Sequence, residues 1–264
     1  MVKNKDILWI FLHVPKTGGS TYSDQIKKYF KEEEFVDTSH VRYGFSKSID
    51  KKNLNKIKVI IGHASYYGIH KLFPNKMERY IIFLRDPVDR LVSSYNFEMR
   101  TKTGKNLDFW KWYKLQPKNE LIHFMDMKFR GKEGTKINVP GRLLKIFHNA
   151  FFSKTVTYFF QNLFKKYFDI FNSNRRMRKK FENSKKLLDR IYYIGFIPGL
   201  DKDLKFLFKE MGIPTKWEDT NVTPKRKIFF KLDENSRKKI YKDNKYDKEI
   251  FDYALKIKNQ ERIK

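Results

Sequence analysis

A short stretch near the start of the chain, residues 7–22, constrains the fold more than any other segment. Residues 7–14 form an uninterrupted apolar run, which indicates a buried strand, and residues 15–19 indicate a turn because they contain proline and two glycines. The residues that follow, 22–34, can form a helix. A strand, a glycine-containing turn and a helix together point backbone N–H groups at a bound anion.

The side chains of this turn suit a phosphate group. Candidate ligands are a cation, hydroxyl groups and glycine N–H groups, supplied by Lys16, Thr17, Gly18, Gly19, Ser20 and Thr21. The order differs from the common nucleotide-binding loop G-x-x-x-x-G-K-[ST], because the lysine precedes the glycines. We therefore predict a P-loop-like phosphate loop of a less common kind. An ordinary strand-to-helix turn is the alternative.

Further apolar runs predict the rest of a sheet. Residues 58–63 and 79–85 have the character of buried strands, and the second is stopped by Asp86-Pro87, a suitable start for a helix. Residues 191–196 are a fourth candidate strand, followed by an amphipathic helix at residues 200–211. Strands that alternate with helices in this way predict an α/β fold with a central parallel sheet flanked by helices.

The remaining segments are expected to be mainly helical. Residues 107–129 are rich in aromatic side chains and predict two helices around Pro117, whereas residues 232–264 predict two helices broken near an asparagine. We expect roughly residues 101–190 to be a helical, basic insertion or peripheral element of one domain that spans residues 1–264. Residues 37–55 are polar and predict irregular structure.

The chain is strongly basic, with 58 Lys and Arg against 30 acidic residues and a formal net charge of +28. Such a field favours anionic partners such as nucleic acid, anionic lipid, acidic glycans or a polyanionic cofactor. Residues 173–186 concentrate the charge, either as a solvated helix face or as a rim that attracts an anionic acceptor. The absence of cysteine excludes disulfides, thiolate metal sites and cysteine nucleophiles.

No secretory signal or membrane-spanning segment is visible in the sequence, because the apolar run at residues 7–14 is too short to cross a bilayer. We therefore expect a cytoplasmic protein. The histidines show no metal-ligand spacing with acidic residues, so no metal site is predicted.

A second candidate anion site follows the strand at residues 79–85. Arg85 ends that strand, where side chains reach the ligand crevice of an open α/β sheet, and Ser93 lies about two helical turns further on. Arg85 could supply a charged fork and Ser93 a hydroxyl group to the same phosphate. Taken alone, both residues are more simply interpreted as solvated surface groups. Together with the first loop, they fit a nucleotide that carries two separate phosphate groups.

In these motifs the sequence resembles the sulfotransferases that use 3′-phosphoadenosine-5′-phosphosulfate (PAPS), and most of all the carbohydrate branch related to heparan sulfate 2-O- and uronyl 2-O-sulfotransferases. The resemblance depends on the Pro-Lys-Thr loop, on Arg85 with Ser93-Ser94-Tyr95, and on Gly62-His63-Ala64-Ser65-Tyr66. Weaker similarity follows at residues 193–196 and 221–226, and roughly residues 101–190 remain uncovered.

The resemblance implies an enzyme that moves a sulfuryl group from PAPS to a hydroxyl group of an oligo- or polysaccharide, possibly an anionic one, and releases adenosine 3′,5′-bisphosphate (PAP). Lys16 would stabilise the bridging oxygen as negative charge develops there, and residues 17–21 would hold the 5′-phosphosulfate. Arg85 and Ser93 would bind the 3′-phosphate. A C-terminal loop that closes over the cofactor would contribute Thr223 and Arg226, with Lys225 as a further candidate.

His63 is the candidate general base, because it follows a predicted strand and a neutral imidazole there could accept the proton of the acceptor hydroxyl. The related 2-O-sulfotransferases have a second histidine two residues earlier, where this chain has Ile61. His63 must therefore act alone or with another partner, and a structural histidine is the alternative. His13 lies inside the first strand and is expected to be a packed core residue.

Two other function classes stay open from the sequence. A P-loop kinase of a small molecule would need an acidic residue at a strand end for Mg²⁺; Thr17 does follow Lys16, but no strand ends in an obvious acid. A nucleic-acid-binding protein is suggested by the charge alone, and no specific nucleic acid is expected. Trp110, Trp112 and Tyr113 could stack on sugar rings, although aromatic residues at helical spacing more often form core.

Overall fold

The computed structural model describes residues 7–39, 51–101, 107–134, 174–215 and 232–261. Their centre is a five-stranded parallel sheet in the order β2-β3-β1-β4-β5. The strands are β1 (Ile7–Phe11), β2 (Phe35–Asp37), β3 (Val59–Ile61), β4 (Met77–Arg85) and β5 (Tyr193–Ile197). The prediction of an α/β fold with a central parallel sheet is confirmed.

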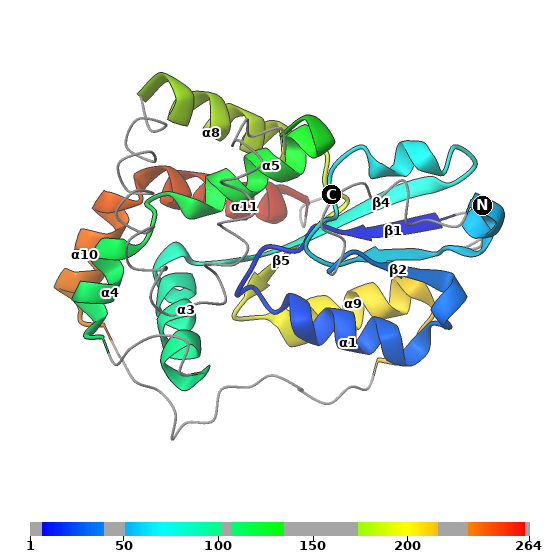
Figure 1. Ribbon diagram of the computed structural model, residues 1–264, viewed down its shortest axis with the longest axis horizontal. Coiled ribbons are helices and arrows are strands. Elements are labelled where there is room, and N and C mark those ends of the chain that lie inside the picture. Colours follow the sequence, from blue (N-terminus) through cyan, green and yellow to red (C-terminus); the bar gives the residue numbers. More distant parts are fainter. Residues whose placement is uncertain (1–6, 40–50, 102–106, 135–173, 216–231, 262–264) are drawn as a thin grey trace, which may run out of the picture.

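Helices cover both faces of this sheet (Figure 1). The α-helices are α1 (Gly19–Tyr29), α3 (Pro87–Thr101), α4 (Phe109–Leu115), α5 (Glu120–Gly134), α8 (Asn174–Leu188), α9 (Leu200–Met211), α10 (Glu234–Asp243) and α11 (Lys245–Glu261). Short 3₁₀ helices are η2 (Glu32–Glu34), η3 (Lys51–Lys56) and η4 (Ile69–Leu72). Among the described residues, no helix is both long and apolar enough to cross a membrane.

The alternation of side chains along β1 explains the two layers of helices. Leu8 and Ile10 point to one face, where they join a buried cluster with residues of α5, α8 and α11. Trp9 and Phe11 point to the other face and pack with residues of α1 and α9. Because both faces are covered, the strand is apolar at every position, as is typical of parallel sheets.

Several expected boundaries hold and two do not. Helix α9 ends at Met211 with Gly212 in a left-handed conformation (φ 69°), and α10 and α11 are separated at Asn244, both as predicted. The helix expected to reach residue 34 instead ends at Tyr29, because Phe30 is extended (φ −107°). The irregular structure expected from residue 37 was wrong at its start, since β2 includes Asp37 and pairs with β3.

Helix α5 is anchored at its start by residues of α3 and α11. The buried carboxylate of Asp247 accepts hydrogen bonds from the backbone N–H groups of Leu121 (2.9 Å) and Ile122 (3.0 Å). The buried guanidinium of Arg90 forms an ion pair with Glu120 in the same turn (2.8 Å). The bonds to Asp247 satisfy N–H groups that have no partner within the helix, and with the ion pair they fix where α5 begins.

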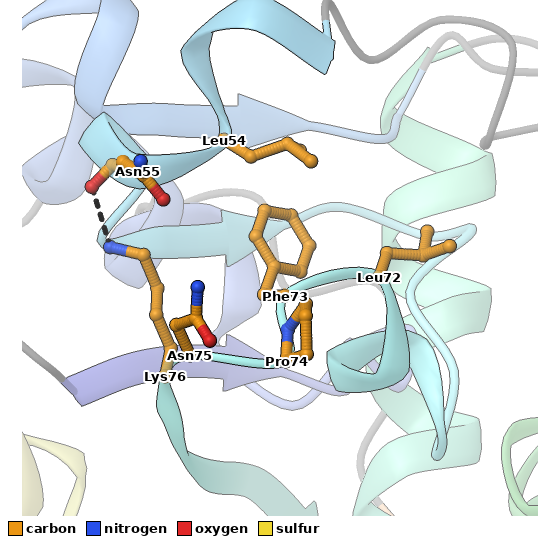
Figure 2. Close-up of a pocket in the computed structure, with 7 residues that line it drawn as sticks. All are labelled: Leu54, Asn55, Leu72, Phe73, Pro74, Asn75 and Lys76. Carbon is orange, nitrogen blue, oxygen red and sulfur yellow. Dashed lines mark hydrogen bonds between the residues drawn. The ribbon is translucent and has the colours of Figure 1, made fainter.

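A pocket lies between η3 and η4 at the amino end of β4 (Figure 2). Leu54, Leu72, Phe73 and Pro74 line it, and Lys76 bridges it with a hydrogen bond from Nζ to the carbonyl oxygen of Asn55 (2.8 Å). In a parallel sheet the amino and carboxyl ends of the strands lie at opposite edges. This pocket is therefore remote from the loops that follow β1 and β4, where the sequence places its candidate residues.

Candidate functional site

The loop between β1 and α1 has an unusual backbone. Lys16 adopts a left-handed conformation (φ 67°), and so does Gly18 (φ 82°). A positive φ is uncommon for a residue with a side chain, and such strain is concentrated at functional sites. The hydroxyl of Thr17 donates to the carbonyl of Val14 (2.8 Å), so this side chain stabilises the loop. The group that Thr17 can offer a ligand is its backbone N–H.

The two glycines of the loop are required by close packing. A Cβ atom at Gly19 would lie 2.3 Å from the ring of His13. A Cβ atom at Gly18 would lie 2.7 Å from the side chain of Leu200, at the start of α9. Helix α1 begins at Gly19 with no side-chain cap and no acidic residue in its first turn, which suits an anion near its N-terminus.

Cations gather beside this loop. The Lys16 ammonium lies 3.9 Å from the centre of the Phe97 ring, and the Arg100 guanidinium lies 5.6 Å from the same ring. Burial lowers the pKa of Lys16, and repulsion from Arg100 and Arg85 lowers it further. Lys16 and Arg85, assigned to two anion sites on sequence grounds, are thus close enough to interact. Arg100 was missed, since nothing in its sequence context distinguished it from other surface arginines.

Arg85 is the last residue of β4. Its Nε atom is buried and has no hydrogen-bond partner among the described residues. The adjacent carboxylates are engaged elsewhere: Arg237 pairs with Asp89 (2.7 Å), and the hydroxyl of Tyr241 donates to Asp86 (2.6 Å). Helix α10 therefore binds the two carboxylates next to Arg85, a contact that sequence reasoning did not assign to Arg237.

Of the other predicted residues, some lie in the described part of the chain and some lie outside it. Ser20 is exposed, Thr21 is buried in the first turn of α1, and Ser93 is half-buried in α3. Thr223 and Arg226, together with Lys225, lie outside the described residues. The described part of the chain holds no cluster of three or more His, Asp or Glu residues that could bind a metal ion.

His63 follows β3 and is exposed. Its backbone is preceded by Gly62 in a left-handed conformation (φ 100°), where a Cβ atom would lie 2.5 Å from the backbone nitrogen of Ser39. Partial burial of the ring lowers the pKa of His63, the charge of Lys128 lowers it further, and Asp37 opposes them. The imidazole is therefore neutral at physiological pH and can accept a proton.

His13 joins His63 to the phosphate loop. The two rings stack with centres 4.0 Å apart and planes inclined by 19°. His13 is buried, as predicted, and its burial lowers its pKa to about 3, so it stays neutral. The His13 ring also packs closely against Gly19, so His13 contacts both the start of α1 and His63. The contact between these histidines was not foreseen.

The structure also shows where the predicted aromatic and basic segments lie. Trp112 and Tyr113 are buried in a cluster formed with residues of α3 and α10, which supports their interpretation as core. The basic residues expected at 173–186 lie on α8, where Arg175, Arg178, Lys179 and Lys186 are exposed. This helix packs on α5 above the sheet (Figure 1).

Comparison with known proteins gives the family of the chain. A family model described as the sulfotransferase family matches residues 1–254. The chain belongs to the sulfotransferase family. One curated relative of this sulfotransferase, a protein-tyrosine sulfotransferase from Arabidopsis thaliana, is 27% identical over 137 residues, which cover 43% of the chain and 26% of the relative. The aligned part thus spans about a quarter of that relative's length.

Proposed function

We propose that this sulfotransferase transfers the sulfuryl group of PAPS to a hydroxyl group of a carbohydrate, with His63 as general base. The observation that carries the proposal is the contact of His13 with both Gly19 and His63. It brings an exposed, neutral imidazole to the side of the loop that we propose holds an anion. A donor on the loop and a hydroxyl beside His63 would then be neighbours.

The residues present fit the donor. A cluster of cations lies here: Arg85 with its unpartnered buried nitrogen, the half-buried Lys16, and Arg100 of α3. Glu98 is an acidic neighbour of Lys16. An anion with more than one phosphate group would satisfy these charges. We assign Lys16 and the backbone of residues 17–21 to the 5′-phosphosulfate, and Arg85 with Ser93 to the 3′-phosphate.

When bound, PAPS would supply the sulfuryl group, and PAP would leave with the bridging oxygen on its 5′-phosphate. His63 would accept the proton of the attacking hydroxyl, which leaves that oxygen free to bond to sulfur. Lys16 would stabilise the negative charge left on the phosphate oxygen. Most of the rate acceleration would come from position and electrostatics, as in phosphoryl transfer.

For the acceptor we favour a carbohydrate with anionic groups. The resemblance of the Gly62-His63 segment to 2-O-sulfotransferases supports the sugar, and the exposed basic residues of α8 support the negative charge. A tyrosine side chain in a protein is the second candidate, because the relative from Arabidopsis thaliana is named for that activity.

The donor is tested by thermal unfolding with PAP, ATP, AMP and a DNA duplex. PAP should raise the melting temperature at micromolar concentrations, since a ligand that binds only the folded state stabilises it. Lys16→Ala should abolish this response, and Lys28→Ala, which removes an exposed lysine of α1, should keep it. No response of the wild-type protein to PAP would refute the proposal, and a response to ATP alone would favour a kinase.

The acceptor is tested by transfer of radioactive sulfate from labelled PAPS. The panel contains a chemically desulfated glucuronic acid polysaccharide, a neutral polysaccharide and an acidic peptide with one tyrosine. Label in the acidic polysaccharide alone supports the carbohydrate proposal. Label in the peptide alone would replace it with the tyrosine candidate.

A further inference from the structure

Lys128 is a buried lysine of helix α5 that the proposed chemistry does not use. Only 6% of its surface is exposed, and it has no ion pair with a carboxylate among the described residues. Its ammonium group donates hydrogen bonds to two backbone carbonyl oxygens, those of His63 and Ser65, the second at 2.8 Å. An interior lysine is thus aimed at the segment that carries the candidate base.

A lysine is a costly residue for this position. Removing an ammonium group from water is unfavourable unless a negative charge compensates it, and burial lowers the pKa of Lys128 to about 7. An apolar side chain of similar length would fill the same space without that penalty. What distinguishes lysine here is the ability to donate to the two carbonyl groups and to carry a charge.

We propose that Lys128 is a positioning residue, whose two hydrogen bonds hold the His63–Ser65 backbone so that the His63 imidazole faces the acceptor hydroxyl. The inference depends on the proposed role of His63 as general base. It assigns to α5, within the region expected to be peripheral, a direct part in shaping the site.

The same residue holds the segment through its main chain. The carbonyl of Lys128 accepts a hydrogen bond from the N–H group of Tyr67 (2.7 Å). On the other side, the hydroxyl of Ser65 donates to the carbonyl of Phe11 in β1 (2.6 Å). The segment from His63 to Tyr67 is therefore fixed between the sheet and α5, and α5 is itself anchored by Asp247.

The charge of Lys128 adds a second effect. The titratable groups that influence one another here are His63 after β3, His13 after β1 and Asp37 at the end of β2. Lys128 lowers the pKa of both histidines, and Asp37 raises both. Asp37 is partly neutralised by its ion pair with Lys27, so the positive charge on α5 favours the unprotonated form of His63.

The charge effect is tested by NMR titration of the histidine side chains in ¹³C-histidine-labelled protein. The His63 signal is identified by its loss in His63→Gln. In Lys128→Met the titration midpoint of His63 should move to higher pH, because the neighbouring positive charge is gone. Lys180→Met is the matched control: it removes a half-buried lysine that contacts His123 instead, and it should leave His63 unchanged. A midpoint of His63 that stays or falls in Lys128→Met would overturn the inference.

The positioning effect is tested by sulfuryl transfer to the acceptor that the panel identifies. Lys128→Met should lower kcat by about 10- to 100-fold, as expected for a displaced catalytic group, while the dissociation constant of PAP stays within about twofold. Lys128→Arg, which keeps the charge, should restore the His63 midpoint. Wild-type kcat, or a parallel loss of PAP binding, would refute the positioning role. Absence of PAP binding in the wild type would instead refute the proposed function, and the NMR result would still stand.

Discussion

The phosphate loop and the His63 segment both follow buried strands of the same sheet, yet they are shaped in different ways. The loop takes most of its form from its own residues: Lys16 and Gly18 are left-handed, and Thr17 bonds to Val14 three positions earlier. The His63 segment is held by groups far away in the chain, above all by Lys128. The comparison teaches that the shape of the candidate phosphate loop is set mainly by residues close in sequence, whereas the position of the candidate base depends on contacts from distant parts of the fold.

The largest effect is expected from a change in the His63 segment that leaves the phosphate loop intact. His63→Ala should lower sulfuryl transfer by about 10²- to 10⁴-fold, the usual contribution of a general base, and leave the affinity for PAP unchanged. The measurement is kcat with labelled PAPS beside PAP binding by calorimetry. His70→Ala is the control, because that ring contacts the hydroxyl of Tyr80 away from the site. Full activity of His63→Ala would assign the base to another residue.

The opposite result is expected on the phosphate side. Arg85→Ala should raise the dissociation constant of PAP by about 10- to 100-fold, because it removes charge-assisted hydrogen bonds to a phosphate. Transfer at saturating PAPS should fall much less. Arg79→Ala tests the same strand at its other end, where the guanidinium pairs with Glu210 (3.0 Å), and should leave PAP affinity intact. Equal PAP binding by Arg85→Ala and wild type would contradict the assignment of Arg85.

Gly19→Ala should impair both the phosphate loop and the His63 segment. The new Cβ atom would force the His13 ring to move, which destabilises the protein by about 1–3 kcal/mol and displaces His63 as well. We expect weaker PAP binding and slower transfer together. Gly212→Ala, whose Cβ position faces open space, should affect stability only. Adding His13→Ala should partly relieve the clash, so the two changes should not be additive.

The smallest effect concerns pH. The pKa of His63 is lowered from its ordinary value of 6.5, so the ring stays unprotonated at a lower pH than a free histidine would. The value of kcat should therefore be constant from neutral pH to below 6.5 and fall only under more acidic conditions. An acidic limb above pH 6.5 in the measured profile would mean that His63 gains rather than loses affinity for protons.

Much of the fold was predictable because its signals are local. The apolar runs of β1, β3, β4 and β5, the glycine after α9 and the break at Asn244 each follow from a few adjacent residues. Strand β2 was missed, since it has three residues, all of them half-buried, and gives no alternating pattern. This segment is a strand because it pairs with β3, a contact that its own residues do not indicate.

The sequence motifs predicted the main residues of the candidate site, but not the residues that contact them. Lys16, Arg85 and His63 stand out because they lie at or just after the end of a predicted strand, but their partners come from elsewhere in the chain. One signal was available: Leu121, Met125 and Lys128 recur at positions i, i+4 and i+7, so a helical pattern would have placed the lysine on the buried face. No comparable pattern indicates that Arg237 would bind the acidic neighbours of Arg85.

The left-handed backbone at Lys16 has a consequence for association. The turn is already fixed by the bond from Thr17 to Val14 and by the packing of Gly18 and Gly19. Its conformational entropy is therefore lost during folding, and an incoming anion does not have to order it again. A preorganised loop of this kind devotes nearly all of its interaction energy to holding the ligand, which favours tight binding by a small number of contacts.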